Sequence, residues 1–136
     1  MLNITQEFVN EVLRNNNGKL LKKQYKNKWN KNNPTFGYCY IVCEAIYHYS
    51  NENLYPYCIN YGETIGTHWY LKDDKNNVID FTGNQFNFPV DYSKGIRKSF
   101  FKGSIKTNKG FISKRGYEVA KLLNIVDSKD GLTYGK

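Results

Sequence analysis

The spacing of apolar residues changes along the chain, and the changes predict where helices and strands lie. In residues 3–14 the apolar positions recur at helical spacing behind a capping residue, Asn3. The positions are Phe8, Val9, Val12 and Leu13. Residues 40–49 are almost continuously apolar, which predicts a helix buried on most sides and therefore central to the fold.

Two stretches carry the pattern of strands. Residues 55–61 are rich in Tyr and Ile and end at a glycine, as a strand does. Residues 68–82 predict a hairpin in which arms 68–71 and 78–82 flank a polar turn. Folding that hairpin about Lys75 and Asn76 brings His68 and Asp80 within side-chain reach on neighbouring arms.

The rest of the chain is less regular until its last predicted helix. Residues 84–95 look irregular, and residues 94–109 predict a basic surface loop with a short strand or turn. Ser113 is the predicted cap of a final helix whose apolar face is formed by Tyr117, Val119, Ala120, Leu122 and Leu123. These elements predict an α+β fold with helices against a small antiparallel sheet. The length predicts a single domain over residues 1–136.

Composition and charge narrow the picture. The chain is 40% hydrophobic and 16% aromatic, which is a globular composition. Its net charge of +8 suits an anionic partner, and the basic residues of greatest interest are Lys94, Arg97, Lys98 and Arg115. The alternative is a compositional habit, because the chain is also rich in Asn, Tyr and Ile and its charges are spread rather than striped.

The cysteines and the absence of targeting signals suggest a location. The three cysteines are odd in number, and we find neither a leader pattern nor an apolar run of membrane-spanning length. We therefore expect a cytoplasmic protein with reduced thiols and no membrane partner. Cys39 and Cys43 lie one helical turn apart, but the spacing of Cys and His is unlike that of zinc sites. No metal and no cofactor is expected, and Cys43 and Cys58 are expected in the core.

One set of residues carries a coherent chemistry. Cys39 falls where a loop meets the predicted central helix, and a helix start favours the thiolate that makes cysteine a nucleophile. His68 would act as the base, and Asp80 would orient His68 and stabilise its charged form. The alternative is a small buried cysteine, a hairpin histidine and an edge aspartate without a joint role.

The hairpin residues also resemble a known family. His68-Trp69, a turn, and then Val78-Ile79-Asp80-Phe81-Thr82 resemble the transglutaminase core, in which His and a later Asp-x-Thr follow a helix-start Cys. The order Cys, His, Asp is that of the wider papain-like superfamily. The resemblance covers residues 36–85. It implies a papain-like or transglutaminase-like fold, in which the helix carrying Cys39 packs on the sheet carrying His68 and Asp80.

A second resemblance spans more of the chain. Small uncharacterised proteins of bacteriophages and prophages are similar in short motifs. These are Gly37-Tyr38-Cys39-Tyr40, Glu44-Ala45, Thr67-His68-Trp69, Asp80-x-Thr82-x-x-Gln85-Phe86 and Ser113-Lys114-Arg115. This resemblance implies no activity. If the chain is phage-encoded, its location would be the host cytoplasm.

The chain departs from the papain-like pattern at the oxyanion donor. Papain-like proteases carry Gln before the Cys, whereas Asn33 stands six residues upstream here. Asn33, a Tyr or Gln85 is therefore the candidate for the donor that would act with the Cys39 backbone N–H. The candidate pocket residues are Tyr38, Tyr40, Trp69, Thr82, Arg97 and Lys98.

Two functions remain open from the sequence. The first is a cysteine-dependent hydrolase or acyltransferase that acts on an amide, ester or thioester of a small molecule or protein. The second is a phage-type anti-defence protein on the same scaffold, which binds or degrades an anionic nucleotide signal through stacking aromatic rings and basic side chains. The sequence leaves the substrate and the oligomeric state open.

Overall fold

The computed structural model describes residues 3–126. Its α-helices are α1 (Gln6–Asn16), α2 (Lys23–Lys26), α3 (Cys39–Tyr49) and α4 (Lys114–Leu122). Its strands are β1 (Tyr55–Asn60), β2 (Thr67–Lys72), β3 (Val78–Ile79), β4 (Ile96–Arg97), β5 (Ile105–Thr107) and β6 (Gly110–Ile112). Two 3-10 turns, η1 (Gly83–Gln85) and η2 (Tyr92–Lys94), lie between β3 and β4.

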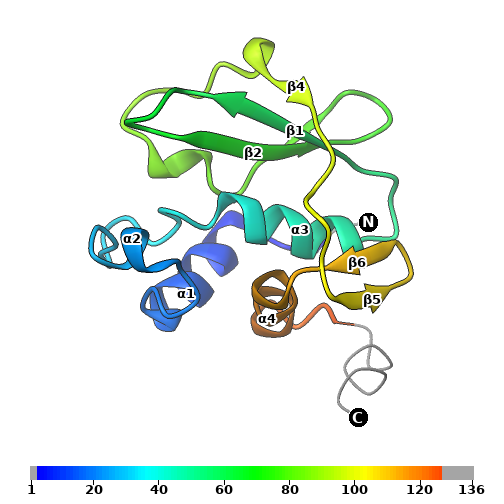
Figure 1. Ribbon diagram of the computed structural model, residues 1–136, viewed down its shortest axis with the longest axis horizontal. Helices are drawn as coiled ribbons and strands as arrows, with labels where there is room; N and C mark the ends of the chain where they lie inside the picture. Colours follow the sequence, from blue (N-terminus) through cyan, green and yellow to red (C-terminus); the bar gives the residue numbers. More distant parts are fainter. Residues whose placement is uncertain (1–2, 127–136) are drawn as a thin grey trace.

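The strands form an antiparallel sheet and a separate ribbon. The four-stranded sheet has the order β3-β2-β1-β4, and β5 pairs with β6. Figure 1 shows this sheet as one layer, α3 beneath it, and α1 and α4 on the far side of α3. The fold is therefore α+β with antiparallel strands, as predicted.

Helix α3 is the centre of this arrangement. Most of its residues are buried, including Ile41, Val42, Ala45 and Ile46. It packs on β1 and β2 on one side and on α4 on the other. The nearly unbroken apolar run of the sequence is explained by these two contacts, because a helix covered on both sides has no face for water.

The flanking helices agree with the sequence pattern in most positions. Val9 and Leu13 of α1 are fully buried, and the Ser113 hydroxyl caps α4 by accepting from the N–H of Gly116. The cap of α1 was predicted wrongly. Thr5 holds that position and its hydroxyl accepts from the Phe8 N–H at 3.1 Å, so Asn3 lies outside the helix.

Some apolar and basic segments differ from expectation. Leu122 ends α4 with 40% of its surface exposed, so it is not part of the buried face. The lysine-rich segment between α1 and α3 contains only the short helix α2, whose residues are not buried.

None of the helices in residues 3–126 combines the length and the apolar character needed to cross a bilayer.

Candidate active site

Cys39 is the first residue of α3, and the chain reaches it through a turn. Gly37 has φ of +80°, a backbone conformation that side chains rarely adopt, and it directs the loop into the helix. No side chain caps this helix start. The first N–H groups of a helix have no intrahelical acceptor, so the Cys39 N–H and the positive end of the helix dipole lie at the sulfur.

His68 and Asp80 come together through the predicted hairpin. Pairing of β2 with β3 ends at Leu71 and Ile79, so Asp80 is the first residue beyond β3. On this register Asp80 is diagonal to His68 on one face of the sheet. His68 Nε2 lies 2.7 Å from Asp80 Oδ2, which confirms the predicted proximity.

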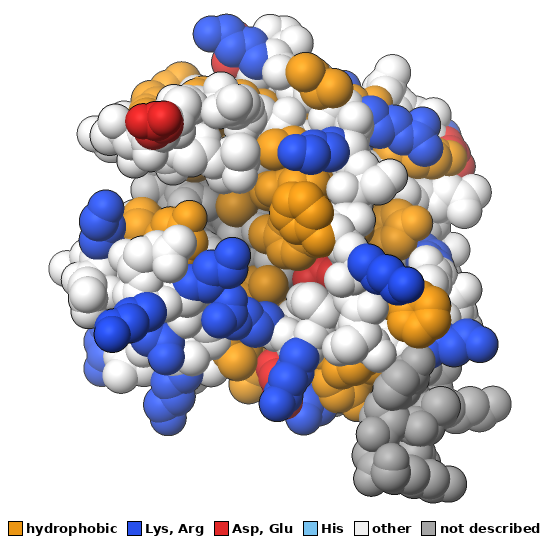
Figure 2. Space-filling model, in the orientation of Figure 1, with side chains coloured by type: hydrophobic (Ala, Val, Ile, Leu, Met, Phe, Trp, Pro, Cys, Tyr) orange, Lys and Arg blue, Asp and Glu red, His pale blue; other side chains and the backbone are white. Residues whose placement is uncertain are grey.

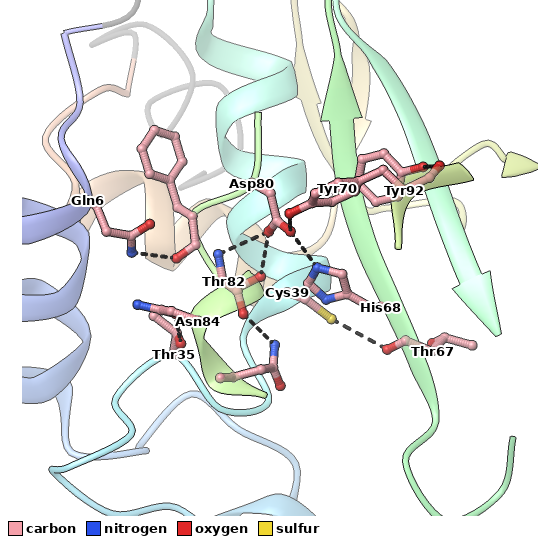
Figure 3. A network of polar contacts seen from close by, with 12 residues as sticks. Gln6, Thr35, Cys39, Thr67, His68, Tyr70, Asp80, Thr82, Asn84 and Tyr92 are labelled. Atoms are coloured by element: carbon pink, nitrogen blue, oxygen red, sulfur yellow. Dashed lines mark hydrogen bonds and ion pairs between the residues drawn. The ribbon is translucent and has the colours of Figure 1, made fainter. Parts of the chain in front are cut away.

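Asp80 is a buried carboxylate with several donors. Its side chain is 2% exposed. Besides the His68 contact, Oδ2 accepts from the Tyr92 hydroxyl at 2.7 Å, and Oδ1 accepts from the Thr82 N–H at 3.1 Å (Figure 3). Burial alone would raise the pKa of Asp80, but the hydrogen bonds and the charge of His68 lower it. The carboxylate therefore stays ionised.

The ionised carboxylate determines the form of the imidazole. Because Asp80 accepts, Nε2 of His68 carries the proton and Nδ1 of the neutral ring carries the lone pair. Nδ1 is buried and has no hydrogen-bond partner within the described chain. Burial lowers the pKa of His68. The hydrogen bond to Asp80, the interaction with Cys39 and the charges of both outweigh burial, and the pKa rises to about 9.

The sulfur of Cys39 completes the arrangement. Sγ lies 3.7 Å from the carbonyl oxygen of Thr67, the residue before His68. Figure 3 shows the thiol beside the imidazole, on the side away from Asp80. Phe86 covers the ring edge-on, with centroids 5.0 Å apart. The geometry can hold a thiolate and an imidazolium as a pair, because the unpartnered Nδ1 can donate to the sulfur once it is protonated.

Cys39 opens onto a cleft of about 940 Å³ between the helices and the sheet. Figure 2 shows a hollow on this face with apolar side chains inside it and Lys or Arg side chains around it. Its aromatic lining consists of Tyr25, Phe36, Tyr40, Trp69, Phe86, Phe88 and Phe101. Its basic lining consists of Lys22, Lys28, Lys102, Lys114 and Arg115, and no Asp or Glu of the described chain lines it.

The predicted pocket residues divide into those that line the cleft and those that do not. Tyr40 and Trp69 both line it, and their rings meet edge to face at 5.0 Å. Tyr38 is fully buried instead, and its hydroxyl donates to Asn16 Oδ1 at 2.6 Å. Thr82 is also buried and supports Asp80 rather than facing the cleft.

Arg97 and Lys98 do not line this cleft. They line a second depression of about 630 Å³, where the Arg97 guanidinium lies 4.3 Å from the centre of the Tyr55 ring. The physical reason is the pairing of β4 with β1, which carries this segment to the far edge of the sheet from β3. The Lys98 ammonium lies 5.8 Å from the centres of the Trp69 and Phe101 rings, which line the Cys39 cleft. Among the other basic residues, Arg115 lines the Cys39 cleft and Lys94 does not.

Each predicted oxyanion side chain uses one of its two amide N–H groups within the fold. Asn33 and Gln85 line the cleft, but Asn33 Nδ2 donates to the Gln85 carbonyl at 2.9 Å. Gln85 Nε2 donates to the Thr82 carbonyl at 3.0 Å. Asn33 Nδ2 and Gln85 Oε1, which accepts from the Gly37 N–H at 3.4 Å, hold the loop after Asp80 against the loop before Cys39. The Cys39 backbone N–H belongs to the same residue as the sulfur, and the second N–H of each amide leaves Asn33 and Gln85 as candidate donors beside it.

His48, Cys43 and Cys58 are buried and do not line the Cys39 cleft. His48 Nδ1 lies 2.6 Å from the Thr107 hydroxyl, and burial with the charge of Lys109 lowers its pKa to about 4. Burial raises the pKa of Cys43 and of Cys58. Across residues 3–126, no group of three or more His, Cys, Asp and Glu is arranged to hold a metal ion.

Several residues of the site were not predicted from sequence. Tyr92 belongs to a stretch without periodicity, so nothing in the pattern indicated that its hydroxyl reaches Asp80. Lys102 and Lys114 were present in basic segments, but only folding brings them to one cleft.

No protein-family model, curated protein or solved structure matches this chain.

Proposed function

We propose that this protein is a cysteine-dependent hydrolase or acyltransferase that acts on an amide, ester or thioester carbonyl. One observation carries the proposal: the His68 imidazole is bonded to Asp80 through Nε2, while its buried Nδ1 has no hydrogen-bond partner within residues 3–126 and lies on the side of Cys39. A buried polar atom without a hydrogen-bond partner lowers the stability of the fold. Such a cost is explained if Nδ1 forms its hydrogen bond with the Cys39 thiolate or with a reacting group of the substrate.

The first half-reaction follows from these positions. The Cys39 thiolate attacks the carbonyl carbon of the substrate, and a C–S bond forms. The negative charge that develops on the carbonyl oxygen is stabilised by the Cys39 N–H and the positive end of α3. His68 then gives its Nδ1 proton to the leaving amine, alkoxide or thiolate as the bond to carbon breaks.

The second half-reaction reverses these roles. Water or another acceptor attacks the carbonyl carbon of the acyl-thioester and forms a bond to it, while the neutral His68 Nδ1 takes the acceptor's proton. The tetrahedral intermediate collapses, the C–S bond breaks, and the proton on His68 restores the ion pair with Cys39. Asp80 keeps its charge throughout and holds the ring in the orientation that both steps need.

The chain order and the arrangement also support a papain-like or transglutaminase-like relationship. The nucleophile opens the central helix, and the histidine and aspartate follow on neighbouring antiparallel strands or just beyond them. The departure is the oxyanion donor, since Asn33 stands six residues before Cys39 where papain-like proteases carry Gln. The proposed activity uses the backbone donor at Cys39, with the second amide N–H of Asn33 or Gln85 as the candidate partner donor.

The proposal is tested by the pH dependence of iodoacetamide labelling at Cys39, followed by mass spectrometry. At pH 6 an ordinary thiol with a pKa of about 8.5 is under about 1% thiolate. An ion pair with His68 should keep the labelling rate at pH 6 within about threefold of its rate at pH 8. In His68→Gln the rate should fall as it does for an ordinary thiol.

The matched control is His48→Gln, because it removes the other histidine without touching the site. This variant should retain the wild-type labelling profile, and circular dichroism establishes that both variants are folded. An ordinary thiol profile in the wild type, or one unchanged in His68→Gln, would overturn the proposal.

A binding function is the second candidate, and the combination of aromatic rings and cations around the cleft favours it. Such a lining suits a nucleotide, whose base stacks on rings and whose phosphates pair with Lys or Arg. A ligand that binds the folded state raises the melting temperature. Stabilisation by nucleotides or cyclic dinucleotides with an ordinary Cys39 labelling profile would favour this candidate. No shift across the panel would exclude it.

A further inference from the structure

The charge around the Cys39 cleft is one-sided. All five charged residues that line it are cations, and none of them forms an ion pair with a carboxylate within residues 3–126. Surface cations are ordinarily interspersed with acidic residues, and the chain has 12 of these. A concave site lined by one sign of charge concentrates ligands of the other sign.

Two of these cations lie at the N-terminus of a helix, where cations are ordinarily unfavourable. Lys114 and Arg115 open α4, whose first turn contains no acidic residue. Cations at a helix N-terminus oppose the helix dipole, so their location does not serve the helix itself. Ser113, which precedes them, is fixed to α3 because its N–H donates to Glu44 Oε2 at 3.1 Å. The start of α4 is thus held to the helix that carries Cys39.

The interior of the cleft is apolar and aromatic rather than charged. Phe86 and Phe88 stack with centroids 4.9 Å apart on one side, and Tyr40 and Phe101 stack at 5.6 Å on another. The Tyr40 hydroxyl accepts from the Phe101 N–H at 2.6 Å, which fixes that side of the lining. Such a surface accommodates a flat or elongated apolar group with little ordering cost.

From these two features we infer that the acyl substrate of Cys39 has an apolar body and carries a negative charge, as a carboxylate or a phosphate. This inference rests on the proposed function and specifies its substrate class. The anion binds Lys114, Arg115 and the neighbouring cations, and it takes no part in bond making. Its binding places the carbonyl carbon at the sulfur, where charge-assisted contacts give both affinity and orientation.

The first test uses two alkylating reagents of similar size that differ in charge. Iodoacetate is an anion and iodoacetamide is neutral, so the ratio of their Cys39 labelling rates measures the cleft potential. In Lys114→Gln/Arg115→Gln the ratio should fall severalfold at low ionic strength, because two unit positive charges are removed from the cleft. Lys19→Gln/Lys106→Gln removes the same charge from exposed positions outside the cleft and should leave the ratio unchanged.

The second test uses thioesters of one thiol with three acyl groups of equal chain length. The neutral hexanoyl thioester is compared with the adipoyl thioester, which ends in a carboxylate, and with a matched thioester that ends in a phosphonate. We expect kcat/KM at least about tenfold higher for an anionic donor, with most of that advantage lost in Lys114→Gln/Arg115→Gln. The two anionic arms distinguish a carboxylate from a phosphate.

The outcomes separate this inference from the proposed function. Equal turnover of neutral and anionic thioesters, with a labelling ratio insensitive to Lys114 and Arg115, would overturn the substrate class and leave the cysteine mechanism standing. An ordinary pH profile of Cys39 labelling, unchanged in His68→Gln, would overturn the mechanism and this inference with it. A labelling ratio that still favours iodoacetate in that case would indicate that the cleft binds anions but does not turn them over.

Discussion

The pKa values of the two histidines can be measured separately, and that of His68 reports directly on the electrostatics of the site, because the structure places the two pKa values far apart. His68 has a pKa raised to about 9 and His48 has a pKa lowered to about 4. An unperturbed histidine titrates near pH 6.5, in the middle of that interval. Asp80→Asn is the informative change, because asparagine keeps an acceptor for Nε2–H and removes the charge.

The magnitude follows from the raised pKa of His68. The rise from the ordinary pKa of 6.5 to about 9 corresponds to about 3–4 kcal/mol, since a tenfold change in a proton equilibrium is worth about 1.4 kcal/mol. Because the pKa is raised on folding, this stabilisation is fully present below pH 6.5 and is lost as pH rises from 6.5 through 9. In Asp80→Asn the charge of Asp80 is lost while burial and the interaction with Cys39 remain, so the pKa of His68 should fall from about 9.

The assay is a pH titration of the imidazole resonances by NMR, with His68→Gln to assign the two signals. Urea unfolding of the wild type and of Asp80→Asn at pH 6, 7, 8 and 9 gives the free energy of unfolding in parallel. The wild type should lose stability between pH 6.5 and 9, and the variant should show a flatter dependence. His48 is the internal control and should keep its low pKa in both proteins. A wild-type His68 titration near pH 6.5, or one unchanged by Asp80→Asn, would refute the electrostatic argument.

Two further substitutions test how the fold supports the site. A Cβ on Gly83 would lie 2.7 Å from Asp80 Oδ2, so Gly83→Ala should displace that carboxylate and lower the pH 6 iodoacetamide labelling of Cys39 severalfold. Unchanged labelling would contradict this role of the glycine. Glu44→Ala leaves the Ser113 N–H and hydroxyl without their acceptor and should lower the free energy of unfolding by about 1–3 kcal/mol, measured by urea titration. The control Glu118→Ala removes only a surface ion pair and should cost under about 1 kcal/mol, so equal losses would argue against the Glu44 contact.

The parts of the structure that were predicted from sequence depend on local patterns. Cys39 was placed at a helix start because a polar loop changes there to an apolar run, and α3 begins at that residue. His68 and Asp80 were paired because the turn between them sets the register of the hairpin. In both cases the information lies within a few residues of the feature.

The parts that were missed depend on contacts between distant segments. Tyr92 reaches Asp80 only because the irregular chain after β3 folds back over the sheet. Asn33 and Gln85 each donate one amide N–H to a backbone carbonyl, and periodicity does not indicate where those carbonyls lie. Arg97 lies outside the Cys39 cleft because β4 joins the edge of the sheet next to β1. The composition of the cleft likewise results from loops that periodicity does not describe.

Helix α3 connects three separate parts of the molecule, and this restricts how the chain can change in length. Cys39 opens the helix at the sulfur site, Glu44 binds the start of α4, and His48 binds Thr107 on the β5–β6 ribbon. Each residue added to or removed from an α-helix rotates everything beyond it by about 100°. An insertion between Cys39 and His48 would therefore turn at least one of these contacts away from its partner. Natural length variants should accordingly carry their insertions outside residues 39–48 and keep this helix at a fixed count.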